Sequence, residues 1–147
     1  KRLDVTPMSL YRHVGTHEEL LRTLSARVYA DVLAPPDPSL APLLEVSALL
    51  SRYYMAIGRH PQLTLAIFSA PQAFAGVTRE ITDRLTALLA TVTDQPVQWR
   101  DILIDHAHGS GLALVVARGD PVQARAMTAQ YQQALACLLQ RLSVHVP

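Results

Sequence analysis

The chain has 147 residues, and because half of them are hydrophobic and only 17% are charged, it can bury a substantial core within one domain. This composition excludes a disordered protein, and a formal net charge of +1 is too small to indicate nucleic-acid binding by itself. The longest near-apolar run, residues 111–117, is far too short to span a membrane, and no secretory signal is visible. The single cysteine, Cys137, cannot form an internal disulfide, which suits a reducing compartment. We therefore expect a soluble cytoplasmic protein with no membrane partner.

Two helices separated by a glycine are predicted at the start of the chain. The first covers about residues 6–13, because a Thr-Pro pair suits a helix start and Gly15 suits a helix end. Thr16 then begins the sequence THEE, a capping box in which the Glu19 side chain reaches back to the cap. We expect the second helix to cover residues 17–33.

A proline-rich segment follows this pair of helices. Residues 35–38 contain three prolines, which predict a short, stiff linker. We take this segment as the boundary between an N-terminal unit, residues 1–34, and a larger unit, residues 38–147. No internal repeat divides the chain further.

Hydrophobic residues that recur every three or four positions predict that the larger unit is built from helices. The expected helices cover about residues 43–57, 62–69, 77–92, 97–118 and 121–142. On the third of these, Glu80 and Arg84 are spaced to form an exposed ion pair. No segment shows the alternation that is typical of a β-strand. The sequence therefore predicts an all-α fold.

The first helix carries side chains that suit DNA recognition. In helix-turn-helix proteins the N-terminal residues of the recognition helix read base edges in the major groove, and longer polar side chains contact phosphates. Small, apolar and hydroxyl groups come first in this helix, and Tyr, Arg and His follow. The alternative is a chance helix-loop-helix surface. The candidate DNA-binding residues are Thr6, Pro7, Met8, Ser9, Tyr11, Arg12, His13 and His17.

The stretch SLYRHVGTHEELL, residues 9–21, resembles the hallmark of the TetR family of transcriptional regulators, roughly L-Y-x-H-[VF]-x-x-K-[ED]-x-L-L. In that family the residues matching 7–9 meet bases, and those matching 11–13 contact the DNA backbone and thymine methyl groups. This sequence has His17 where the family usually has Lys, so that phosphate contact is expected to be weaker or pH-dependent. The family's DNA-binding domain has three helices, two of which would precede residue 1. The resemblance therefore implies that double-stranded operator DNA is bound by a longer parent chain.

The resemblance also implies that the remaining helices form a dimerisation and ligand-binding domain. A weaker similarity to the tetracycline-repressor-like branch rests on DHAHGSGLAL, residues 105–114, and ALACLL, residues 134–139. Small residues allow a second helix to approach closely, and the alternative is that these helices pack inside one subunit. The expected homodimer interface contains Gly109, Ser110, Gly111, Ala113, Leu135, Leu138 and Leu142.

A ligand receptor needs a mostly apolar pocket with a few polar groups. For each candidate the alternative is a place in the core, and His60 equally suits the C-terminal end of a helix, where a cationic side chain is favoured. The candidate ligand-binding residues are Tyr54, His60, Ile67, Phe68, Phe74, Trp99, Leu103 and His106.

Neither a metal nor a cofactor is expected. Asp101, Asp105 and His108 share a helix face, but a solvated acidic stripe is commoner than a metal site at such a spacing. Ile67 and Phe68 lie nearest to the position at which tetracycline repressors have a magnesium-binding histidine. We therefore expect a small, mostly apolar effector in place of a magnesium–tetracycline complex.

The sequence does not predict an enzyme, because it has no nucleophile elbow, no phosphate-binding glycine loop and no Cys/His constellation. The resemblance implies a ligand-responsive repressor that binds a palindromic operator as a homodimer and is released by its effector. The alternative is a helical small-molecule-binding protein with no role on DNA.

Overall fold

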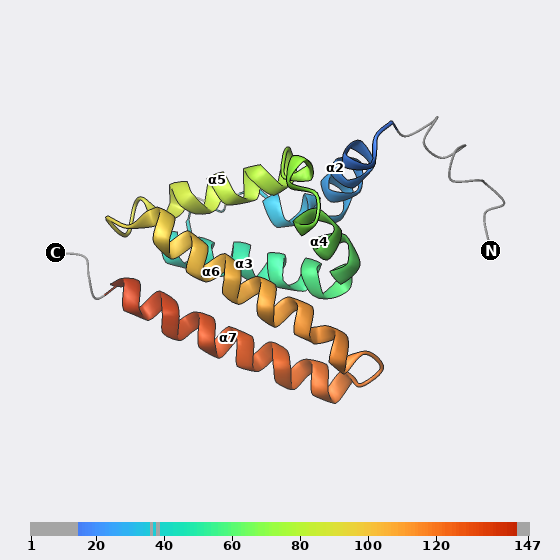
Figure 1. Cartoon of the computed structure of the whole chain (residues 1–147). Helices are drawn as coiled ribbons and strands as arrows, with labels where there is room; N and C mark the ends of the chain where they lie inside the picture. The colour runs from blue at the N-terminus through green and yellow to red at the C-terminus, as the bar shows by residue number, and fades with distance from the viewer. Residues whose placement is uncertain (1–14, 36, 38, 144–147) are drawn as a thin grey trace.

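The computed structural model describes residues 15–35, 37 and 39–143 (Figure 1). This part of the chain is helical and contains no strand, which confirms the predicted all-α fold. None of its helices has both the length and the apolar character that a membrane crossing requires. The α-helices are α2 (His17–Val28), α3 (Pro42–Arg59), α4 (Pro61–Phe68), α5 (Val77–Leu89), α6 (Pro96–Ala113) and α7 (Pro121–Ser143). Three short 3-10 helices, η1 (Ala30–Leu33), η2 (Pro71–Ala73) and η3 (Leu114–Ala117), lie between them.

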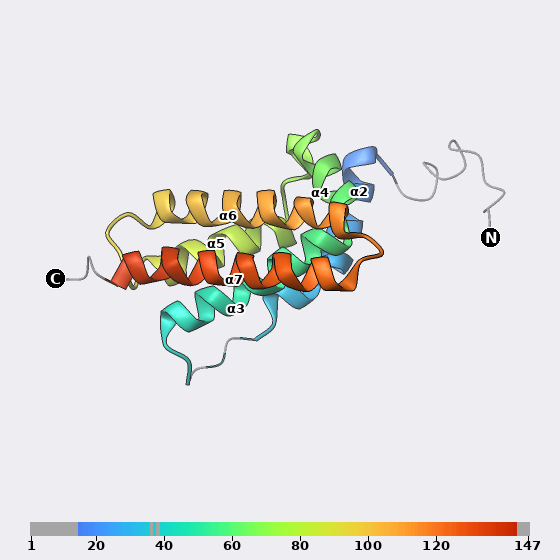
Figure 2. The ribbon, with the colours of Figure 1, turned by 90° about the horizontal axis from the view of Figure 1, so that it is seen from below.

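Helix α3 lies in the middle of the bundle and contacts α5, α6 and α7. Both views show α6 and α7 side by side, running in opposite directions and joined by a short connection (Figures 1 and 2). The shorter helices α2 and α4 lie together at one end of the bundle, with η2 beside them. Leu21, the last residue of the stretch 9–21 that resembles the TetR hallmark, packs with Ala70 and Ala73 at this end of the bundle.

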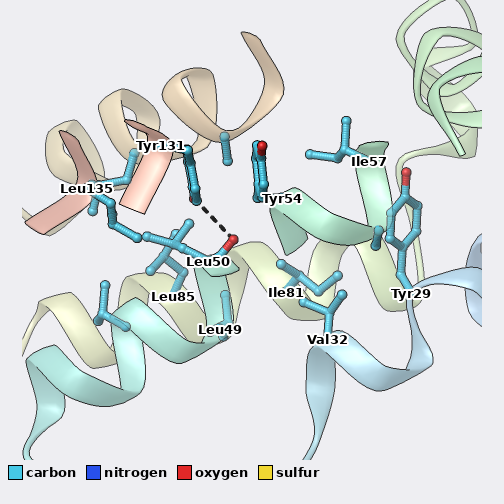
Figure 3. Close-up of a cluster of buried hydrophobic side chains, with 14 of the residues drawn as sticks. Tyr29, Val32, Leu49, Leu50, Tyr54, Ile57, Ile81, Leu85, Tyr131 and Leu135 are labelled. Atoms are coloured by element: carbon cyan, nitrogen blue, oxygen red, sulfur yellow. Dashed lines mark hydrogen bonds between the residues drawn. The ribbon is translucent and has the colours of Figure 1, made fainter. Parts of the chain in front are cut away.

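The main hydrophobic core is formed by α3, α4, α5, α6 and α7 together with Tyr29 and Val32 (Figure 3), and a smaller cluster of Leu21, Ala70 and Ala73 lies apart from it. The centre of the main core is the apolar stripe of α3, where Leu49, Leu50 and Ile57 are completely buried. Burying one such side chain stabilises the fold by about 1.5–3 kcal/mol relative to leaving it exposed. The Tyr131 hydroxyl of α7 donates a hydrogen bond to the Leu50 carbonyl oxygen at 3.1 Å. Helix α7 is therefore held to α3 by packing and by a buried hydrogen bond.

Two glycines bring α3 and α6 into close contact. A Cβ atom on Gly111 would lie 2.8 Å from Cγ2 of Ile57 and 3.1 Å from the Tyr54 carbonyl oxygen. A Cβ atom on Gly58 would lie 2.5 Å from Cδ1 of Leu114. These distances are shorter than ordinary contacts of a Cβ atom, so the approach of α6 to α3 depends on the missing side chain of Gly111, and the packing of Leu114, the first residue of η3, depends on that of Gly58.

The predicted capping box at the start of α2 is confirmed. The Glu19 backbone N–H donates to the Thr16 hydroxyl at 3.2 Å, and the Thr16 N–H donates to the Glu19 carboxylate at 2.7 Å. Gly15, with φ of 76°, precedes this cap. However, α2 ends at Val28, so the helix expected over residues 17–33 is shorter than predicted and η1 completes that segment. The buried Tyr29 lies at the junction between the two helices.

The predicted domain boundary does not separate residues 17–33 from the rest. Tyr29 and Val32 belong to the same hydrophobic core as the later helices. In addition, Arg84 Nη1 of α5 donates to the Ala34 carbonyl oxygen at 2.7 Å, and Arg52 Nε of α3 donates to the Val32 carbonyl oxygen at 3.2 Å. The described residues of the N-terminal unit therefore pack into the same core as the later helices, and the division into 1–34 and 38–147 stays a prediction.

The expected ion pair between Glu80 and Arg84 is also wrong. The guanidinium of Arg84 points toward α3 and donates to the buried carboxylate of Glu45. The Nη2 atom of Arg52 also lies 3.6 Å from Oε1 of Glu45. The i,i+4 ion pair on α5 is formed instead by Arg79 and Asp83, at 3.7 Å on the surface. Arg84 lies on the side of α5 that faces α3, so it pairs with Glu45, which is 39 positions away in sequence.

Candidate ligand pocket

A cavity of about 220 Å³ lies between the end of α2 and helices α3, α4, α5 and α6. Most of its wall is aromatic or aliphatic, as expected for a site that binds small molecules. Phe68 and Phe74 are each half exposed and form its apolar rim. We call this cavity the aromatic pocket, and its lining residues are Tyr29, Tyr53, Thr64, Ile67, Phe68, Pro71, Phe74, Thr78 and His108.

A hydrogen-bonded pair of polar side chains lies inside the aromatic pocket. The Tyr53 hydroxyl of α3 and Nε2 of His108 on α6 are 2.7 Å apart, and the Phe68 ring packs edge-on against the imidazole with ring centroids 4.7 Å apart. Burial lowers the pKa of His108, and the nearby Asp105 carboxylate opposes this effect only in part. Burial raises the pKa of Tyr53, with a smaller contribution from Tyr29. At neutral pH the pair is therefore an uncharged imidazole with an uncharged phenol.

A second hydrogen bond in the pocket wall joins the end of α2 to α4. The Tyr29 hydroxyl lies 2.8 Å from the Thr64 hydroxyl oxygen, and both side chains are buried. The Thr64 hydroxyl in turn donates to the His60 carbonyl oxygen at 3.3 Å, so Tyr29 is the donor to Thr64. The Tyr29 and Tyr53 rings are in contact, with centroids 5.7 Å apart. Tyr29, the residue at which α2 ends, therefore forms part of the pocket wall that a bound molecule would contact.

A more polar cleft of about 360 Å³ adjoins the aromatic pocket and shares Tyr53, Phe74 and His108 with it. Its other walls carry charged side chains, including Arg100 and Asp101, which form an ion pair at 2.7 Å. Tyr53 and His108 therefore lie between an apolar chamber and a charged one. This arrangement suits a mostly apolar molecule whose single polar group reaches the Tyr53–His108 pair.

Three of the predicted ligand-binding residues, Ile67, Phe68 and Phe74, line the aromatic pocket together. The other five do not line it. Leu103 is completely buried in the core, Trp99 is half-buried against it, and His60 is exposed at the end of α3. Tyr54 and His106 each stack on the Tyr131 ring, with centroid separations of 4.0 and 5.0 Å.

The phase of each helix explains why neighbours of predicted residues form the pocket. Successive residues of an α-helix are rotated by about 100°, so Tyr53 faces the pocket while Tyr54 faces α7. Similarly, His108 faces the pocket and His106 packs on α7. The sequences YY and HAH show that a ring is present on α3 and on α6, but they do not show which of the two rings faces the pocket. The pocket residues that the sequence did not indicate are Tyr29, Tyr53, Thr64, Pro71, Thr78 and His108.

The acidic stripe that could have held a metal with His108 is not arranged as a site. Among the described residues, no three His, Cys, Asp or Glu side chains come together as metal ligands. Asp101 instead accepts hydrogen bonds from Arg100, and His108 bonds to Tyr53.

Most of the predicted DNA-binding residues lie outside the described part of the chain. These are Thr6, Pro7, Met8, Ser9, Tyr11, Arg12 and His13. The remaining one, His17, is the first residue of α2 and is exposed, as a contact to a phosphate requires. Comparison of the chain with protein-family models, with curated proteins and with solved structures gives no match.

The predicted dimer interface divides into two groups. Gly111 packs against α3, and Leu135 and Leu142 are buried within the core of the single chain. Each lies on the side of its helix that faces α3 or the core. The others lie at or near the surface: Gly109 is exposed, and Ser110, Ala113 and Leu138 are half-buried.

Proposed function

We propose that the chain belongs to a ligand-responsive transcriptional repressor of the TetR type, which binds a palindromic operator as a homodimer. A small, mostly apolar effector enters the aromatic pocket and releases the operator. The motif at residues 9–21 supports the DNA-binding half of this proposal, and the aromatic pocket supports the ligand-binding half. The alternative function, a small-molecule-binding protein with no role on DNA, requires only the pocket.

The observation that carries the proposal is that Tyr29 both ends α2 and forms a wall of the pocket. Helix α2 begins at His17, inside the motif, so it connects the expected DNA-recognition helix to the ligand pocket. A molecule that separates Tyr29 from Thr64 shifts the end of α2 relative to α4. For such a shift to release DNA, the effector must bind the two conformations with different affinities.

The chemistry of the pocket defines the class of effector. The Tyr53–His108 pair is uncharged at neutral pH, and the surrounding wall is apolar. A fully charged group would lose its hydration there without gaining an opposite charge, which is costly. We therefore infer an effector with an apolar body and one neutral hydrogen-bonding group, such as a hydroxyl, a carbonyl or an amide.

Dimerisation is proposed through the outward surfaces of α6 and α7. Gly109 offers a close approach, because a Cβ atom built there would meet nothing within 4 Å. Ser110, Ala113 and Leu138 lie beside this surface and are incompletely buried. A palindromic operator requires such a two-fold dimer, with its two recognition helices about one DNA turn apart.

The DNA-binding half is tested by selecting genomic fragments with the purified full-length protein at low and at moderate salt. We expect enrichment of one palindrome, and we expect Tyr11→Ala to abolish it while Arg118→Ala, a change at an exposed position of the helical body, leaves it intact. The circular dichroism spectrum of each variant establishes that it is folded. Absence of any enriched palindrome at both salt concentrations would contradict the DNA-binding role.

The ligand-binding half is tested by screening neutral apolar compounds for an increase in melting temperature. Phe68→Ala removes part of the pocket wall and is expected to weaken binding of a hit about tenfold, given the area that the ring contributes. Leu65→Ala on the same helix removes a similarly exposed side chain that does not line the pocket, and it serves as the matched control. A compound that binds the pocket but never changes operator affinity would favour the alternative function.

A further inference from the structure

A second groove, lined by three arginines, lies between α2, η1 and the C-terminal half of α3. Its volume is about 610 Å³, and it shares no lining residue with the aromatic pocket. Arg27 comes from the last turn of α2, and Arg52 and Arg59 come from α3. Among the described residues that line it, Asp31 alone is acidic. We call this the basic groove, and its three guanidinium groups and one carboxylate leave an excess of two positive charges.

The positive charge of the basic groove is poorly neutralised by the protein. Neither Arg27 nor Arg59 has an ion-pair partner in the described part of the chain, and both side chains are exposed. Arg52 approaches Glu45 at 3.6 Å, but its Nη2 atom is buried and has no hydrogen-bond partner. Glu45 is itself shared with Arg84. Like charges that converge on one concave surface attract an anion more strongly than isolated surface charges do.

The floor of the basic groove is apolar. Val28 and Val32 contribute from the α2 side, and Met55 and Ala56 contribute from α3. Guanidinium groups bind carboxylate and phosphate oxygens through paired, charge-assisted hydrogen bonds, whereas an apolar floor packs against carbon atoms. A ligand for this surface therefore needs anionic groups joined by a carbon skeleton, and Asp31 disfavours an anionic group placed beside its own carboxylate.

We propose that the basic groove binds a small organic anion that carries two or more carboxylate or phosphate groups on a short carbon skeleton. Because Arg27 lies on α2 and Arg59 on α3, one such ligand bridges the two helices at the surface. The basic groove shares no lining residue with the aromatic pocket, so this proposal does not rest on the proposed effector or on a role on DNA. The bound anion would hold the C-terminal end of α2 against α3.

The proposal is tested by isothermal titration of the full chain with citrate and, separately, with 2,3-bisphosphoglycerate, at constant ionic strength. Citrate tests a ligand whose anionic groups are carboxylates, and 2,3-bisphosphoglycerate tests one that carries phosphates on a short carbon skeleton. The double variant Arg27→Gln/Arg59→Gln removes two of the charges that face the groove. The matched control Arg118→Gln/Arg125→Gln removes two exposed charges that do not line it. Urea unfolding of both double variants establishes that they are folded.

We expect the wild-type chain and the control to bind at least one of the two anions at a single site. The groove variant is expected to bind that anion at least about tenfold more weakly, since each arginine loses a charge-assisted hydrogen bond. Failure of the wild-type chain to bind either anion would overturn the proposal. An equal loss in the control variant would also overturn it, because binding would then depend on net charge alone.

Discussion

The Tyr29 hydroxyl donates a hydrogen bond to the Thr64 hydroxyl at 2.8 Å, which joins the C-terminal end of α2 to the middle of α4 inside the wall of the aromatic pocket. The two residues are 35 positions apart in sequence and both are buried. Their bond links α2, which begins within the stretch of residues 9–21, to α4, the helix that carries Phe68. A change in the pocket can thus reach α2 through one contact.

Tyr29→Phe removes this bond and keeps the ring, so we expect a loss of about 1 kcal/mol in the free energy of unfolding. Thr64 retains its own bond to the His60 carbonyl oxygen, which limits the loss. Urea denaturation measures the change. Tyr54→Phe is the matched control, because its longer bond to Thr128, at 3.3 Å, is expected to contribute less than about 0.5 kcal/mol. A larger loss for Tyr54→Phe than for Tyr29→Phe would contradict this ranking.

Alanine at the two glycines of α6 is expected to have opposite effects. At Gly109 a Cβ atom meets nothing within 4 Å, so Gly109→Ala should stabilise the subunit by up to about 1 kcal/mol through helix propensity. At Gly111 the same atom meets Ile57 at 2.8 Å, and the strain should exceed that gain, for a net loss of about 1 kcal/mol. Thermal unfolding at low protein concentration compares them.

The same pair of variants also examines the proposed dimer surface. If a partner helix is seated on Gly109, Gly109→Ala weakens self-association while it stabilises the isolated subunit. Sedimentation velocity over a range of concentrations measures the association. Unchanged association of Gly109→Ala would place the dimer contact elsewhere.

Glu45→Gln is expected to destabilise the fold by about 2 kcal/mol. The Glu45 side chain is buried, and its loss of charge leaves the Arg84 guanidinium without its ionic partner. The expected loss of stability is smaller than for a fully buried ion pair because Arg84 and Arg52 are partly exposed. Glu80→Gln, on the exposed side of α5, is the control and should change the unfolding free energy by less than about 0.5 kcal/mol. Equal losses of unfolding free energy for Glu45→Gln and Glu80→Gln in urea titrations would contradict the pairing of Arg84 with Glu45.

Stability should decrease as the pH falls through the ordinary range for histidine. The folded-state pKa of His108 is lowered by burial, so below an unfolded-state pKa of about 6.5 the unfolded chain binds more protons than the folded one. The contribution of His108 is therefore fully present above that value and is lost as the pH falls toward the lowered pKa. His108→Gln should flatten the dependence of the urea midpoint on pH in this window. His60→Gln, at an exposed position, should retain the wild-type slope; a slope unchanged in His108→Gln would refute the assignment.

Local signals in the sequence predicted the helices well. Glycine, proline and the THEE capping box act within a few residues, so the start of α2 and the breaks near Pro61, Pro96 and Pro121 were all anticipated. The end of α2 was not, because Tyr29 turns inward to meet Thr64, a partner that the local sequence does not reveal.

Partners distant in sequence account for the remaining differences. Arg84 has Glu80 one turn before it, yet it pairs with Glu45, which lies on another helix. The pocket residues Tyr53 and His108 are 55 positions apart, and which of two nearby rings faces inward depends on how α3 and α6 pack. Leu135 and Leu142 repeat at helical spacing as a dimer surface would, but α7 directs that stripe into its own core. Periodicity identifies a buried face without identifying what buries it.

The close contact between α3 and α6 at Gly58 and Gly111 has a mechanical consequence for the aromatic pocket. Sliding or rotating either helix would bring backbone and side-chain atoms at these glycines into steric clash, so α3 and α6 are expected to resist relative movement. The opposite wall is carried by α4, a helix of eight residues whose Phe68 is half exposed. A ligand too large for the cavity is therefore expected to move α4, whose Thr64 is bonded to Tyr29, while α3 and α6 stay in place.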